Sequence, residues 1–180
     1  MTFGETSRGS LFLRGCVPTA ATLVLVLLGS LPWALPHAGV LPSLCALISV
    51  YYWSLYRPGQ MPLGAAFLLG IFVDLLGGEP LGTNALVLVL VQAAASSQQR
   101  SLSGKSFAVS WLGYMLISAG AGVVHWIVVC VFFVALVDPT AAVVSHALGV
   151  VFYPALSILL VRVHRLMRAY DDGTLSLIHI

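Results

Sequence analysis

The sequence predicts an all-α integral membrane protein, a compact bundle of about six transmembrane helices. Of its 180 residues, 59% are hydrophobic and only 8% are charged, whereas a soluble domain has about 25% charged residues. The apolar residues also come in solid blocks and do not alternate with polar ones, which favours helices over a barrel. The net charge of +2 gives no sign of nucleic-acid binding.

Six apolar runs are long enough to cross a bilayer, which takes about 17–25 residues. The gaps between them are too short to hold a second domain. The runs are 16–36, 39–56, 61–78, 81–97, 107–134 and 140–164. The first run could be misread as a signal peptide. We expect it to remain as a membrane anchor, because no convincing signal-peptide cleavage site follows it.

Prolines and one acidic residue indicate where several helices begin or bend. Pro42 lies in the first turn of the second run, and Pro62 can open the third. Asp138 and Pro139 resemble a helix cap and first helical residue for the sixth run. Pro154 lies inside that run and should kink it.

The basic residues predict the orientation. If all six runs cross, every lysine and arginine falls on one side of the membrane, while the loops of the other side hold Glu79 and Asp138. The positive-inside rule then places both termini in the cytoplasm. We divide the chain into a cytoplasmic arm (1–15), a six-helix domain (16–168) and a C-terminal tail (169–180). The tail is not expected to continue the sixth helix, and its last six residues are hypothesised to be a cloning or sequence-assembly scar.

Asp74 is the one carboxylate within an apolar run, where a charge is unfavourable by several kcal/mol. Helical spacing puts Phe67, Gly70 and Gly77 on its face, and the two glycines leave room for another helix. Asp74 could bind a cation, a proton or a polar ligand group. Alternatively, it could accept hydrogen bonds from the following turn, cap a broken helix or pair with a histidine. The second interpretation is favoured because free backbone donors follow at Leu81–Asn84.

His125 and His146 are candidate polar partners of Asp74, since they lie in the same half of their runs. A neutral histidine bonded to a carbonyl is the commoner arrangement. The chain has three cysteines without metal-ligand spacing, and none of the familiar hydrolase or nucleotide-binding motifs is present. The sequence therefore predicts no cofactor, no metal and no enzymatic activity.

The run Gly70-x3-Asp74-Leu75-Leu76-x-Gly78-x-Pro80-Leu81-Gly82-x2-Ala85-Leu86 resembles the MreD family of bacterial rod shape-determining proteins. The resemblance covers roughly residues 15–168 and is specific around 67–86. It implies a multi-pass inner-membrane subunit of the machinery that elongates the cell and synthesises peptidoglycan. The partners it implies are an MreC-like periplasmic bitopic protein, the MreB filament, RodA with its class B transpeptidase, and membrane lipids.

The same resemblance implies a fold similar to the substrate-binding subunits of energy-coupling-factor transporters. It places a corner that docks a partner, or forms a pocket, at Gly70, Asp74, Gly77, Gly78, Pro80, Leu81, Gly82 and Asn84. The alternative function is a membrane subunit of a transporter that binds a vitamin-like small molecule. A buried carboxylate in a compact bundle favours that alternative, whereas the bulky first run argues against it.

Overall fold

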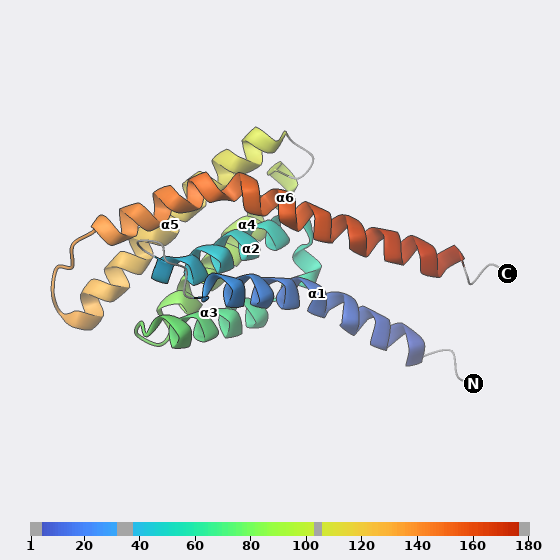
Figure 1. Cartoon of the computed structure of the whole chain (residues 1–180), viewed down its shortest axis with the longest axis horizontal. Coiled ribbons are helices and arrows are strands. Elements are labelled where there is room, and N and C mark those ends of the chain that lie inside the picture. The colour runs from blue at the N-terminus through green and yellow to red at the C-terminus, as the bar shows by residue number, and fades with distance from the viewer. Residues whose placement is uncertain (1–4, 32–37, 103–105, 177–180) are drawn as a thin grey trace.

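A computed structural model of the protein describes the backbone of residues 5–31, 38–102 and 106–176, which form helices and turns without a strand (Figure 1). Side chains are described for residues 17–31, 39–57, 59–99 and 106–165. The α-helices are α1 (Glu5–Gly29), α2 (Leu41–Tyr56), α3 (Leu63–Gly77), α4 (Thr83–Leu102), α5 (Phe107–Phe133) and α6 (Thr140–Ser176). Short 3-10 helices, Ala38–Val40 and Pro58–Gln60, precede α2 and α3.

The helices follow the predicted runs in the middle of the chain and depart from them at both ends. α1 begins within the predicted arm and ends at Gly29, before residue 36. α6 continues through the predicted tail as far as Ser176, so the expectation that the tail leaves the helix is corrected. A helix that has already nucleated extends readily, and no proline lies between residues 155 and 180 to stop it.

The prolines of the inner helices lie near helix starts. Pro42 is in the first turn of α2, and Pro62 directly precedes α3, as predicted. At the start of α6, the Asp138 carboxylate accepts hydrogen bonds from the backbone N–H and the hydroxyl of Thr140. Pro154 lies inside α6, and the kink there stays a prediction.

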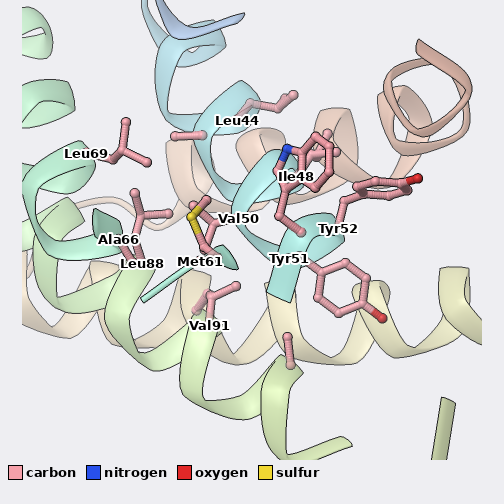
Figure 2. Packing of buried hydrophobic residues seen from close by; sticks show 14 of the residues in the cluster. Leu44, Ile48, Val50, Tyr51, Tyr52, Met61, Ala66, Leu69, Leu88 and Val91 are labelled. Carbon is pink, nitrogen blue, oxygen red and sulfur yellow. The ribbon is translucent and has the colours of Figure 1, made fainter. Parts of the chain in front are cut away.

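α2 is the central helix of the bundle, and none of its residues is exposed. The helices α1, α3, α4 and α6 pack around it. Figure 2 shows part of this core, in which the side chains of α2 lie near those of α3, α4 and the α2–α3 connection: Leu44, Ile48, Val50, Tyr51, Met61, Ala66, Leu69, Leu88 and Val91.

A cluster of three tyrosines joins α2 to the last two helices. The ring of Tyr51 meets those of Tyr114 on α5 and Tyr153 on α6 edge-on, with centroids 5.4 Å and 5.9 Å apart. Tyr114 and Tyr153 stack at 4.5 Å. The Tyr51 hydroxyl donates to the Ser110 carbonyl at 2.9 Å. These contacts satisfy a polar group in the core while burying three large rings.

The bundle is apolar outside and holds hydrogen-bonded polar side chains inside. Leu68, Leu116 and Val131 are 68%, 72% and 71% exposed. In the interior, Thr22 and Ser49 share a hydrogen bond of 2.7 Å between α1 and α2. Soluble monomers rarely expose large contiguous apolar patches, whereas hydrogen bonds between small polar residues commonly join membrane helices.

Two of the described helices are long and apolar enough to cross a membrane, as judged by length and composition alone. They are Phe107–Phe133 and the Thr140–Arg165 part of α6. Three further apolar helices are shorter: Val17–Gly29, Leu41–Tyr56 and Leu63–Gly77. The described residues thus support two spans, and the other four predicted crossings stay a prediction.

The bundle has two distinct ends (Figure 1). α1 begins and α6 finishes at one end, which we call the terminal end; the α2–α3 connection lies there as well. The α3–α4 and α5–α6 connections lie at the opposite end, which we call the corner end. The residues that the sequence singles out gather at the corner end.

Candidate functional site at the corner end

The turn between α3 and α4 depends on glycine and proline. α3 ends at Gly77, and Gly78 follows with a φ of 66°, a left-handed conformation that glycine adopts without strain. Pro80 has no N–H to continue a helix. Gly82 has a φ of 99°, and α4 begins directly after it at Thr83. The chain therefore reverses between Gly78 and Gly82.

Asp74 caps the start of α4 from the neighbouring helix. Only 1% of its surface is exposed. Its Oδ2 atom accepts the Gly82 N–H at 2.8 Å, and its Oδ1 atom accepts the backbone and side-chain N–H groups of Asn84 at 2.9 Å and 3.0 Å. The first N–H groups of a helix have no partner within the helix. The carboxylate supplies acceptors for them and holds the turn closed.

α3 and α4 approach each other very closely at Gly70. A Cβ atom at this position would lie 2.8 Å from the carbonyl carbon of Asn84 and closer still to the backbone of Ala85. Backbone atoms of a packed helix cannot move aside as the end of a long side chain can. The missing side chain of Gly70 is therefore what lets α4 lie against Asp74.

Two residues of the predicted face of α3, Phe67 and Gly77, are exposed and lie outside the buried stripe of that helix. Gly77 is exposed, and a Cβ atom there would meet only the side chain of Glu79, at 3.8 Å. Phe67 is 48% exposed. Positions 67 and 77 lie away from the buried stripe, which follows the i, i+3, i+4, i+7 spacing of a helix face. The buried residues of α3 are Ala66, Leu69, Gly70, Val73 and Asp74.

Glu79 joins the corner to α5. Its Oε2 atom accepts a hydrogen bond from the Asn84 side-chain amide at 2.8 Å and one from His125 Nε2 at 2.9 Å. The hydrogen bond from His125 holds the pKa of Glu79 below its ordinary value, against the opposing effect of burial; the charge of His125 and the bond from Asn84 act in the same direction. Asn84 thus touches both carboxylates of the corner.

The two histidines do not bond to Asp74, contrary to the pairing considered from the sequence. His125 bonds to Glu79, and His146 shares a hydrogen bond of 3.1 Å with Ser118. Both oxygens of Asp74 already accept hydrogen bonds from the start of α4. The N–H groups of Gly82 and Asn84, which follow Asp74 by 8 and 10 residues, therefore satisfy the carboxylate without either histidine.

A cavity of about 400 Å³ opens beside the corner, between α2, α4, α5 and α6. Most of its wall is apolar, with Leu44, Val87 and Val129 among the lining residues. The residues with polar side chains on the wall are Ser43, Glu79, Asn84, Tyr114, Ser118, His125, Trp126, Asp138, Ser145 and His146. A mostly apolar cavity of this size with a few polar groups has the composition of a binding site.

The predicted corner residues take different places around this cavity. Gly77 and Asn84 line it, whereas Gly70 and Asp74 lie in the contact between α3 and α4. Leu81 is 68% exposed on the surface of the turn. Among the described side chains, no group of three or more histidines, cysteines, aspartates and glutamates could hold a metal ion.

Sequence reasoning missed the part that Glu79 takes in the site. It treated Glu79 as a variable position before Pro80, but this residue is the hydrogen-bond partner of His125. The two are 46 positions apart, and no local pattern links them. Trp126, which lines the cavity and donates its indole N–H to the Val137 carbonyl at 2.9 Å, was missed for the same reason.

Comparisons with known proteins agree with the motif at the corner. A family model described as rod shape-determining protein MreD matches residues 11–163. The rod shape-determining protein MreD of Haemophilus influenzae is 39% identical over 57 residues, which are 32% of this chain and 35% of that protein. The match thus spans about a third of the relative's length.

No solved structure matches this chain. The similarity of its fold to the substrate-binding subunits of energy-coupling-factor transporters therefore stays a prediction. Neither the family match nor the relative supports the alternative of a transporter subunit that binds a small molecule.

Proposed function

This chain belongs to the MreD family of rod shape-determining proteins, and from that membership we propose that it is a non-enzymatic subunit of the machinery that elongates bacterial cells. The observation that carries the proposal is the family match over residues 11–163. In this role the protein holds or regulates partner proteins and does not transform a substrate. The partners we propose are an MreC-like bitopic protein, the MreB filament, and RodA with its class B transpeptidase.

The proposed setting is the bacterial inner membrane, crossed six times, with both termini in the cytoplasm. Support comes from the exposed leucine and valine side chains on the outside of the bundle. The charges also divide between the two ends. Arg57, Arg162 and Arg165 belong to segments at the terminal end, whereas Glu79 and Asp138 belong to the corner end. The positive-inside rule then assigns the corner end to the periplasmic side.

The proposed docking site is the cavity at the corner end, and its proposed occupant is the membrane-crossing helix of the MreC-like partner. Such a helix would leave the membrane on the periplasmic side, where the cavity lies in this orientation. Apolar side chains of the partner fit the Leu44, Val87 and Val129 wall. Hydrogen-bond donors or a basic residue near its membrane boundary fit the carboxylates of Glu79 and Asp138.

Filling the cavity tests this proposal. Ala142 lines the cavity on α6, so Ala142→Trp should exclude the partner and cost it about 2 kcal/mol of binding, roughly thirtyfold in affinity. In a bacterium whose own copy is deleted, the variant should leave cells round while reaching the abundance of the unchanged protein. Cell shape is scored by microscopy and abundance by immunoblotting of membranes.

Ala147→Trp is the matched control, because Ala147 is exposed on the same helix and is not among the lining residues of the cavity. Cells that carry it should remain rods. Rod-shaped cells with Ala142→Trp at normal abundance would show that the cavity is not where the protein works.

A further inference from the structure

A second cavity, of about 270 Å³, lies at the terminal end between α2, α5 and α6. Its lining includes Tyr52 and Tyr56 of α2, Phe107 of α5, and Tyr153, Arg162 and Arg165 of α6. We propose that this cavity binds the phosphate headgroup of an anionic phospholipid. The inference rests on the proposed membrane setting and is independent of the docking at the corner end.

The charged residues that line this cavity are both basic. Arg162 and Arg165 are three residues apart on one face of α6, and both line the cavity. Arg57 lies nearby, since its Nε atom donates to His164 Nε2 at 3.2 Å. The carboxylates among the described side chains, at Asp74, Glu79 and Asp138, belong to α3 and to the corner end.

Two further acids lie on α6 beyond the described side chains. Asp171 follows Arg165 by six positions, which is about 9 Å along a helix, and Asp172 follows by one more. Among the described lining residues of the cavity there is no carboxylate beside Arg162 and Arg165, and paired guanidinium groups are well suited to bind phosphate.

The apolar part of the wall indicates a lipid as the source of the phosphate. Ile158, which lines the cavity one turn before Arg162, is 58% exposed, and Phe107 is 48% exposed. An acyl chain can lie against these side chains while the headgroup reaches the arginines. The Tyr56 hydroxyl donates to Ser110 Oγ at 3.1 Å, which fixes part of the aromatic wall. Basic pockets between membrane helices on the cytoplasmic side are suited to acidic headgroups.

Lipid retention measured by native mass spectrometry tests the inference. The whole protein is purified, stripped of lipid in detergent and titrated with phosphatidylglycerol, phosphatidylcholine or inorganic phosphate. We expect phosphatidylglycerol to bind more tightly than phosphatidylcholine, and inorganic phosphate to bind negligibly. Arg162→Gln and Arg165→Gln should each weaken phosphatidylglycerol binding about fivefold, and the double variant roughly twenty-five-fold.

Arg100→Gln is the charge-matched control, because it removes one arginine from α4, a helix that contributes none of the described lining residues. It should leave the affinity unchanged, and monodisperse size-exclusion profiles show that each variant is folded. If Arg100→Gln weakened phosphatidylglycerol binding as much as Arg162→Gln does, the loss would reflect the net charge of the protein and not a specific site, which would overturn the proposal. Inorganic phosphate that binds as tightly as the lipid would also overturn it. The rod-shape test at Ala142 reports on the proposed function separately.

Discussion

Gly70→Ala is expected to destabilise the bundle by about 3 kcal/mol, the upper end of the usual range for overpacking. The new methyl group would lie 2.8 Å from the carbonyl carbon of Asn84 and closer to the backbone of Ala85. α4 must then move away from α3, which also pulls the Gly82 and Asn84 donors from Asp74. In detergent, the midpoint of thermal unfolding should fall by roughly 6–12 °C.

Gly64→Ala on the same helix is the matched control, because nothing lies within 4 Å of a Cβ atom at that position. Alanine also has the higher helix propensity, by about 1 kcal/mol, so this variant should be as stable as the parent or slightly more so. Equal thermal midpoints for Gly70→Ala and Gly64→Ala would mean that the two helices do not meet as closely as described.

Asp74→Ala is expected to cost about 3–5 kcal/mol. The substitution leaves the Gly82 N–H and two N–H groups of Asn84 without the carboxylate, in a place that is 1% exposed. A hydrogen bond to a charged group contributes about 1.5–3 kcal/mol, and a buried donor without a partner is unfavourable by a similar amount. Asp74→Asn keeps one acceptor oxygen and should show a smaller loss. Both are measured by thermal unfolding in detergent.

Glu79→Gln serves as the control for losing a carboxylate at the same corner. The side chain of Glu79 is 35% exposed and that of its partner His125 is 27% exposed, so water can replace much of the interaction between the carboxylate and the histidine. Its loss should stay below about 1 kcal/mol. If Asp74→Ala unfolds at the same temperature as Glu79→Gln, then Asp74 is not the cap of α4, and a ligand-binding role becomes the better interpretation.

The local features of the corner could be predicted from the sequence, because each depends on residues that are close in the chain. The glycines and Pro80 indicated a turn, and Gly70 beside Asp74 indicated a tight helix contact. The donors after Pro80 favoured a structural role for the carboxylate, and Gly82 and Asn84 supply them. Pattern rules work here because turn conformations and helix caps are decided by neighbours in sequence.

Features that depend on distant parts of the chain could not be predicted. Glu79 and His125 meet only because α5 packs beside α4, and His146 finds Ser118 by the packing of α6 on α5. The cavity is lined by residues of four helices that are far apart in the sequence, and no local pattern records their meeting. Helix ends were misplaced for a related reason: hydropathy marks where an apolar run stops, whereas α6 continues into polar sequence.

The measurement that tests the central claim most directly is an affinity purification of the tagged protein from its own membranes in mild detergent. Mass spectrometry then identifies the proteins and small molecules that are retained. We predict that an MreC-like bitopic protein is recovered together with other elongation proteins, that Ala142→Trp strongly reduces this recovery, and that no vitamin-like small molecule is present in stoichiometric amount. Recovery of ATPase subunits or of a stoichiometric bound vitamin in place of the elongation proteins would contradict the account.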